Sequence, residues 1–201
     1  MKTAVLLSGQ VRGFKHIVGN LKANLMPNFG DVDLFFYLQS PSSYKIEEYI
    51  APYSLAYESD ILHDTSLFDN YPHGNIDQFL QQWYSLYKCK ELMLLSRKNY
   101  DFVIRTRPDN DFISPFLFQD INPCSINVCS WGGHGGINDR LAVGPFNYML
   151  TYCDFYFHCH RYEGNSESKL ESYLRHNQIP VHFIDYLFYR VNEDGQRREH
   201  P

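Results

Sequence analysis

Short apolar runs alternate along this chain with longer stretches in which apolar residues recur every three or four positions. The short runs suit β-strands, and the longer stretches have the period of amphipathic helices. Strands that are apolar on both faces lie inside a sheet covered by helices. The pattern predicts an α/β fold with a mainly parallel central sheet flanked by helices. The predicted strands are 3–7, 33–38, 53–57, 100–104, 125–130, 140–143 and 181–184, and the predicted helices are 14–25, 42–50, 75–98, 145–160 and 166–176.

The length and charge of the chain limit what it can be. Its 201 residues suit one domain, which we expect over 1–190, followed by a loose charged tail over 191–201. The net charge of −5 argues against a general nucleic-acid binder, but not against a pocket for one nucleotide. No apolar run has the length of a membrane span, and the apolar run at 4–7 is too short for a signal peptide. Five cysteines without a CxxC pair favour free thiols in a cytoplasmic protein.

The turn after the first predicted strand carries glycines and two long polar side chains, in the order Ser8-Gly9-Gln10-Val11-Arg12-Gly13. Ligands of open α/β sheets bind outside the carboxyl ends of the strands. Glycine allows a backbone to approach a ligand, and Gln10 and Arg12 can bond a base or a phosphate. The segment matches neither the dinucleotide fingerprint nor the Walker loop, so an ordinary turn is the alternative. The predicted nucleotide contacts here are Ser8, Gly9, Gln10 and Arg12.

A second candidate site follows the strand predicted at 100–104, where the sequence reads Arg105-Thr106-Arg107-Pro108-Asp109-Asn110-Asp111. Two carboxylates separated by one residue at a strand end can hold a hard cation such as Mg²⁺ or Mn²⁺. Arg105 and Arg107 share one face if the strand continues, and they can then bind a diphosphate. An acidic turn balanced by the neighbouring arginines is the alternative.

Three segments in this order, 7–13, 104–111 and 135–144, resemble GT-A-type glycosyltransferases. They are similar to the small glycosyltransferase domains found in polysaccharide gene clusters and in large DNA viruses, whose setting is the host cytoplasm. The resemblance covers residues 4 to about 190 and implies a GT-A (Rossmann-like) catalytic domain. It implies transfer of a sugar from a nucleotide-diphosphate donor, with UDP the commonest nucleotide, to a glycan or other hydroxyl acceptor. The length leaves little room for an acceptor-binding region, which further domains of a longer chain would supply.

The resemblance also assigns roles to individual residues. Asp109 and Asp111 correspond to the Asp-x-Asp carboxylates that bind Mn²⁺ or Mg²⁺, with Asp109 contacting the metal or the donor ribose. His182 is a candidate third ligand, although an ordinary strand histidine is the alternative. Asp139 is the candidate catalytic carboxylate, which in an inverting enzyme accepts the proton of the acceptor hydroxyl. The alternative for Asp139 is a pair with Arg140 or a turn cap.

Other interpretations remain open from the sequence. A metal-dependent phosphatase-type hydrolase would use Asp109 as nucleophile and Asp111 as general acid. A non-catalytic carbohydrate-binding domain would suit the many tyrosines, but strand–helix alternation disagrees with its usual all-β architecture. The glycine-rich segment 132–136 is either a lid over the donor or a plain turn.

Overall fold

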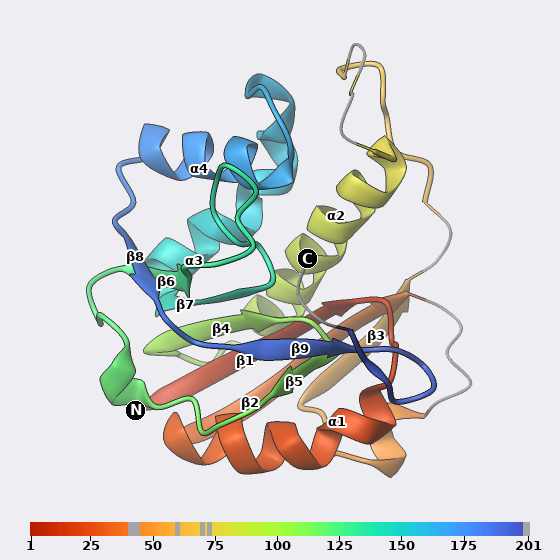
Figure 1. Ribbon diagram of the computed structural model, residues 1–201, viewed down its shortest axis with the longest axis vertical. Helices are drawn as coiled ribbons and strands as arrows, with labels where there is room; N and C mark the ends of the chain where they lie inside the picture. Colours follow the sequence, from red (N-terminus) through yellow and green to blue (C-terminus); the bar gives the residue numbers. More distant parts are fainter. Residues whose placement is uncertain (40–44, 59–60, 69–70, 72–73, 199–201) are drawn as a thin grey trace.

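The computed structural model describes residues 1–39, 45–58, 61–68, 71 and 74–198. Its centre is a sheet of seven strands in the order β3-β2-β1-β4-β7-β6-β8 (Figure 1). Only β7 runs against its two neighbours, so the predicted α/β class with a mostly parallel sheet is confirmed. The strand bounds are β1 Lys2–Gly9, β2 Asp31–Gln39, β3 Ser54–Glu58, β4 Phe102–Thr106, β6 Ile126–Cys129, β7 Leu141–Pro145 and β8 Val181–Ile184.

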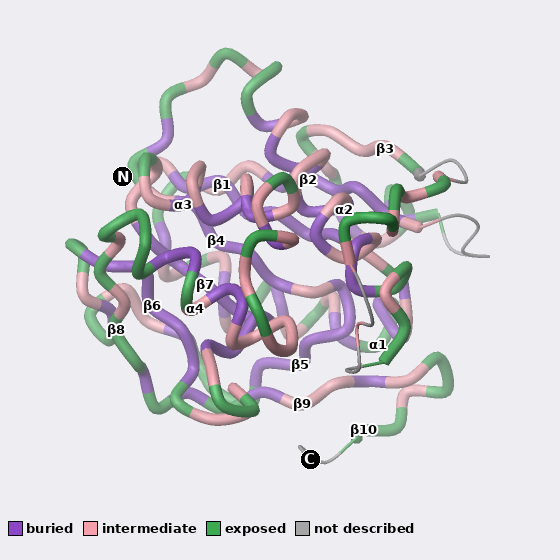
Figure 2. Tube along the Cα trace, turned by 90° about the horizontal axis from the view of Figure 1, so that it is seen from above, coloured by how far each residue is buried: buried purple, intermediate pink, exposed green. Residues whose placement is uncertain are grey.

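Helices cover both faces of the sheet, as Figure 1 shows. Helix α1 (Phe14–Asn20) packs on one face, and α2 (Ile76–Leu95), α3 (Phe146–Cys153) and α4 (Ser166–His176) lie over the other. The buried segments follow the central strands (Figure 2). A second, small antiparallel sheet joins three short strands, β5 (Asn110–Phe112), β9 (Phe188–Val191) and β10 (Arg197–Arg198).

Two predicted helices agree well with the structure because their capping residues are strong. Asn75 begins α2, and its side-chain oxygen accepts hydrogen bonds from the backbone N–H groups of Asp77 and Gln78. Asn165 caps α4 in the same way through the N–H of Ser168. The helix predicted at 145–160 instead stops as an α-helix at Cys153 and continues as short 3-10 turns.

Three other local predictions were wrong in part. Residues 42–44 of the predicted helix 42–50 lie outside the described residues, and the remainder forms one 3-10 turn, Ile46–Glu48. That turn buries only Ile46, so it has no apolar face to extend it. The α-helix predicted over 14–25 ends at Asn20 and continues as a π-helical turn, Leu21–Leu25. The expected loose tail instead folds back through Arg198, because β10 pairs with β9.

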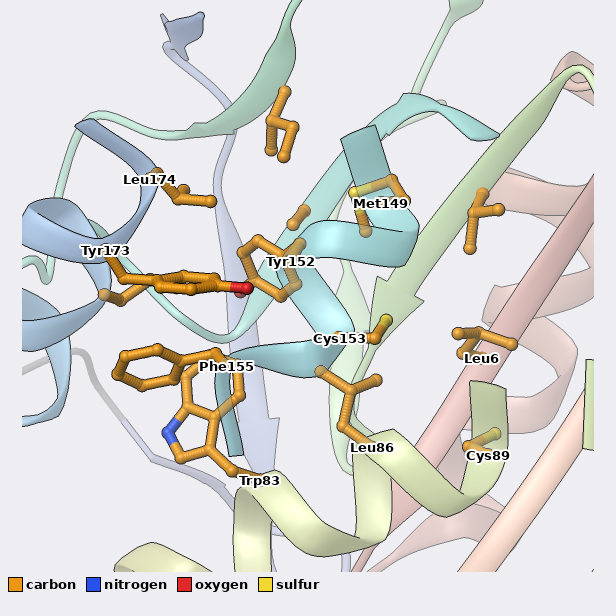
Figure 3. Close-up of a cluster of buried hydrophobic side chains, with 14 of the residues drawn as sticks. Leu6, Trp83, Leu86, Cys89, Met149, Tyr152, Cys153, Phe155, Tyr173 and Leu174 are labelled. Carbon is orange, nitrogen blue, oxygen red and sulfur yellow. The ribbon is translucent and has the colours of Figure 1, made fainter. Parts of the chain in front are cut away.

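The core between the sheet and α2–α4 combines aliphatic and sulfur-containing side chains with large aromatic rings (Figure 3). Trp83 of α2 is fully buried, and its ring meets that of Phe155 edge-on with centroids 4.6 Å apart. Its indole N–H donates to the hydroxyl of Ser166 at the start of α4. Trp83 therefore ties α2 to both the α3 and α4 segments.

Substitution Trp83→Ala should lower the free energy of unfolding by about 3–5 kcal/mol, because it leaves a large cavity and removes the hydrogen bond from the indole N–H to Ser166. Urea denaturation followed by circular dichroism measures this change. The control is Leu95→Ala on the same helix, where the side chain is 75% exposed and the expected change is within about 0.5 kcal/mol. Equal effects of the two substitutions would contradict this account of the core.

Candidate functional site

A cavity of about 420 Å³ opens at the carboxyl ends of β1, β2 and β4. The chain leaves β1 toward β2 on one side, whereas β4 lies on the other side of β1. This is the switch point at which open α/β sheets bind ligands. The cavity is lined by Ser8, Gly9, Gln10, Arg12, Gln39, Ile61, Leu62, His63, Asp77, Gln78, Gln81, Gln82, Arg107 and Arg190.

The turn after β1 forms one wall of this cavity. Gly9 has a φ of +103°, and a Cβ at this position would meet nothing within 4 Å, so its backbone faces open space. Gly13 has a φ of +61°, and a Cβ there would lie 2.4 Å from the carbonyl oxygen of Asn192. The hydroxyl oxygen of Ser8 is buried and has no hydrogen-bond partner among the described residues. The structure thus brings together the four predicted contacts of this turn.

A buried carboxylate, Asp109, holds two arginines of the cavity wall, Arg107 and Arg190. Arg107 donates to Asp109 through Nε at 2.8 Å and Nη2 at 3.1 Å, and Arg190 Nη2 lies 3.4 Å from the same carboxylate. The Asp109 side chain is only 1% exposed. Burial acts to raise its pKa, but the charges of Arg107, Arg190 and Arg12 outweigh burial and hold the pKa below its usual value. Asp109 is therefore negatively charged, and it holds the guanidinium groups of Arg107 and Arg190 in place.

Asp111 belongs to a different pair. It lies on β5, opposite Tyr189 of β9, and its carboxylate accepts a hydrogen bond from Arg197 Nε at 2.7 Å. Neither Asp109 nor Asp111 lines the cavity. The alternative that the sequence left open, an acidic turn balanced by the neighbouring arginines, fits only the pair of Asp109 with Arg107. The other partners, Arg190 and Arg197, come from β9 and β10, and both carboxylates are buried.

The predicted metal site does not fit the side chains present. Both acidic side chains are already paired with guanidinium groups, and a divalent cation at either one would lie beside those positive charges. His182 is exposed on β8, the edge strand of the large sheet, and does not line the cavity. Within the part of the chain that the structure describes, no three His, Cys, Asp or Glu side chains form a metal-binding group. The structure therefore does not bring Asp109, Asp111 and His182 together as one ligand group.

Arg105, a predicted diphosphate contact, does not line the cavity. β4 ends at Thr106, so Arg105 and Arg107 do not share a strand face. Arg105 pairs in register with Ala142 of β7, is 1% exposed and lies near the Tyr152 hydroxyl and Asp139. Burial lowers the pKa of its guanidinium. Arg105 is thus a core residue beneath the site rather than part of the cavity wall.

Asp139 does not line the cavity, but it contacts Gln82, which does. Its carboxylate accepts hydrogen bonds from Gln82 Nε2 at 2.6 Å and from the Ser166 hydroxyl at 3.0 Å. Gln82 lines the cavity, whereas Asp139 itself is 7% exposed and does not. This carboxylate can orient Gln82. Burial raises the pKa of the neighbouring Glu167, and the charge of Asp139 acts in the same direction.

The glycine-rich segment 132–136 packs against α4 rather than over the cavity. The His134 carbonyl oxygen accepts a hydrogen bond from Asn165 Nδ2, and Gly136 closes a turn with Gly133. A Cβ on Gly136 would lie 2.2 Å from the backbone of Glu167, so this contact requires glycine. The segment 132–136 is therefore a turn that packs against the start of α4.

Several cavity residues were missed from the sequence. Gln78, Gln81 and Gln82 form a polar stripe on α2, and their spacing of three and four residues was visible in the sequence. Gln39 ends β2, where the strand-end rule predicts ligand contacts. His63 lies in a segment predicted to be irregular, and Arg190 lies on β9, a strand that was not predicted. The sequence around these two residues gives no sign that they line a cavity.

No protein-family model and no curated protein sequence matches this chain. No helix among the described residues has the length and apolar character to cross a membrane. All five cysteines are free, as predicted.

Substitution Asp109→Asn should lower the free energy of unfolding by about 2–4 kcal/mol at pH 7, because it removes a buried anion that pairs two arginines. The lowered pKa means that this stabilisation is present above the ordinary carboxyl pKa of about 4 and is lost as the pH falls through the folded-state value. The difference between wild type and variant should therefore shrink below about pH 4. Urea denaturation from pH 7 to pH 3 measures it.

The control is Asp31→Asn, because Asp31 pairs with Lys2 while 69% of its side chain is exposed. An exposed pair of this kind contributes less than about 1 kcal/mol. A gap between wild type and Asp109→Asn that stays constant down to pH 3 would show that the carboxylate charge is not what stabilises this region.

Proposed function

We propose that this protein is a glycosyltransferase that takes its sugar from a nucleotide-diphosphate donor. The observation that carries the proposal is the cavity at the switch point between β1 and β4, with Arg12, Arg107 and Arg190 on its wall. Its volume lies within the range of sites for small ligands and cofactors. The resemblance of the segments 7–13, 104–111 and 135–144 to GT-A-type enzymes supports the same activity.

The cavity wall supplies the two kinds of group that a nucleotide sugar requires. Guanidinium groups bind phosphate oxygens through paired N–H donors. The side-chain amides of Gln10, Gln39, Gln78 and Gln81 can donate to and accept from the base, the ribose or sugar hydroxyls. Gly9 leaves room for a ligand against the backbone. UDP remains the first nucleotide to test, on the strength of the resemblance.

The role proposed for Asp139 changes with the geometry. It holds Gln82 at the cavity wall through a 2.6 Å hydrogen bond, which supports a positioning role. Direct acceptance of the acceptor proton would require the side chain of Gln82 to move aside. The acceptor, a glycan or another hydroxyl compound, stays part of the proposal.

The phosphatase-type alternative is weakened by the surroundings of Asp109. A nucleophilic carboxylate must reach a phosphorus atom, whereas Asp109 is 1% exposed and both of its oxygens accept from arginines. The α/β architecture likewise gives no support to an all-β carbohydrate-binding domain.

Calorimetry with UDP, GDP and their sugar conjugates tests the proposal. We expect at least one nucleoside diphosphate to bind, and Arg12→Gln to weaken it by about 10-fold or more, since a charge-assisted hydrogen bond contributes about 1.5–3 kcal/mol. The control Arg175→Gln changes an arginine on α4 whose side chain is 77% exposed, and it should leave binding unchanged. Absence of binding by every nucleotide would refute the proposed function.

Substitution Asp139→Asn should leave nucleotide affinity within about threefold of wild type and slow the hydrolysis of the bound donor, with water as acceptor, by about 10-fold or more. The variant keeps the shape of the side chain but presents an amide where Gln82 and Ser166 donate. Chromatography of the released nucleotide measures the rate. Unchanged hydrolysis would remove Asp139 from the mechanism.

A further inference from the structure

We infer that the cavity binds the diphosphate of its donor through Arg12, Arg107 and Arg190 without a divalent cation. The inference rests on the proposed function and concerns the charge that balances the leaving diphosphate. It departs from the metal-dependent pattern that the Asp-x-Asp resemblance implies. The structure supports it through the carboxylates, the arginines and the composition of the cavity wall.

The first support is that the acidic pair is already occupied. Two guanidinium groups contact Asp109, at 2.8, 3.1 and 3.4 Å, and Arg197 contacts Asp111 at 2.7 Å. A divalent cation bound to Asp109 would have two positive groups within a few ångströms, in a buried environment that weakens charge screening. The side chains therefore favour arginine over metal at this carboxylate.

The second support is that the arginines keep donors for a ligand. Arg107 uses Nε and Nη2 on Asp109, and a guanidinium carries five N–H groups, so others remain. The Nε of Arg190 is buried and has no hydrogen-bond partner in the described part of the chain. The Ser8 hydroxyl also has no hydrogen-bond partner among the described residues, and Ser8 is only 5% exposed. Ser8 and Arg190 both line the cavity. The two unpartnered atoms are themselves buried, so a phosphate oxygen would satisfy either one only after the side chain turns toward the cavity.

The third support is the sign of the charge around the cavity. Three arginines face a single acidic side chain on the described wall, Asp77 in the first turn of α2. Asp77 is thus the one alternative carboxylate that could share a cation with a diphosphate. It lies apart from the Asp109 cluster in the chain and belongs to a helix rather than to the β4–β5 turn. The variant Asp77→Asn, in the calorimetry that follows, tests whether Asp77 binds a cation.

The arginines would act on the leaving group. In the transfer, the bond between the sugar anomeric carbon and the diphosphate oxygen breaks, and its electron pair stays on that oxygen. The acceptor oxygen forms the new bond to the anomeric carbon and releases its proton to a base or to solvent. Negative charge therefore grows on the diphosphate, where fixed guanidinium groups stabilise it.

Calorimetry with inorganic pyrophosphate and with UDP, each in EDTA and in excess Mn²⁺ or Mg²⁺, tests the inference. Mn²⁺ and Mg²⁺ bind pyrophosphate and UDP in solution and lower their negative charge, so we expect neither metal to strengthen binding over that in EDTA. We expect Arg190→Gln to weaken the binding of both ligands by about 10- to 100-fold. Because Arg190 also pairs with Asp109, Arg12→Gln serves as the second variant. It should show the same loss, and circular dichroism should show that it stays folded.

The outcomes separate this inference from the proposed function. Binding of UDP only when the metal is present would overturn the inference and leave the proposed function standing. Loss of such metal-dependent binding in Asp77→Asn would assign the cation to Asp77, and loss in Asp111→Asn would assign it to the acidic pair. Failure of UDP, GDP and their sugar conjugates in every condition would refute the proposed function instead.

Discussion

The contact of Asp109 with two arginines is the interaction on which the site depends. Asp109 follows β4, and Arg190 comes from β9, 81 residues later in the chain. The backbone of Asp109 also accepts a hydrogen bond from the N–H of Val191 at 2.9 Å. One buried carboxylate therefore joins the end of the large sheet to the small one and orients two cations at the cavity wall. Without this anion, neighbouring guanidinium groups would repel each other.

The sheet determines where these groups meet. Because β2 and β4 flank β1 on opposite sides, the segments that follow β1 and β4 separate and leave space at their carboxyl ends. Gly13 then allows the turn after β1 to lie against Asn192, beside β9. The same turn thereby contacts the C-terminal segment that carries Arg190. The cavity is a product of strand order and of one close backbone approach.

Much of the fold was predictable because it follows from local patterns. The apolar runs, the Asn75 cap and the period of α2 are readable within short windows. The turn after β1 was predicted as a ligand wall by the strand-end rule. Arg105 was misplaced because its burial depends on pairing with β7, a strand from a distant part of the chain. Arg190 and Arg197 were missed because β9 forms against β5 and β10 forms against β9, and pairing of this kind has no local signal.

The arginine cluster also bears on how stability and binding are balanced. Burial, and then the charge of Arg107, lowers the pKa of Arg190, so this guanidinium is held in surroundings that disfavour its charge. Asp109 compensates only in part, because one carboxylate faces two guanidinium groups directly and Arg12 at longer range. An anion entering the cavity would complete this compensation. A site that is under-neutralised when empty gains more from a polyanion than from a neutral sugar, since the ligand relieves repulsion that the fold already sustains. The selectivity of the cavity for a phosphorylated donor would then originate in the folded protein itself, before any ligand is bound.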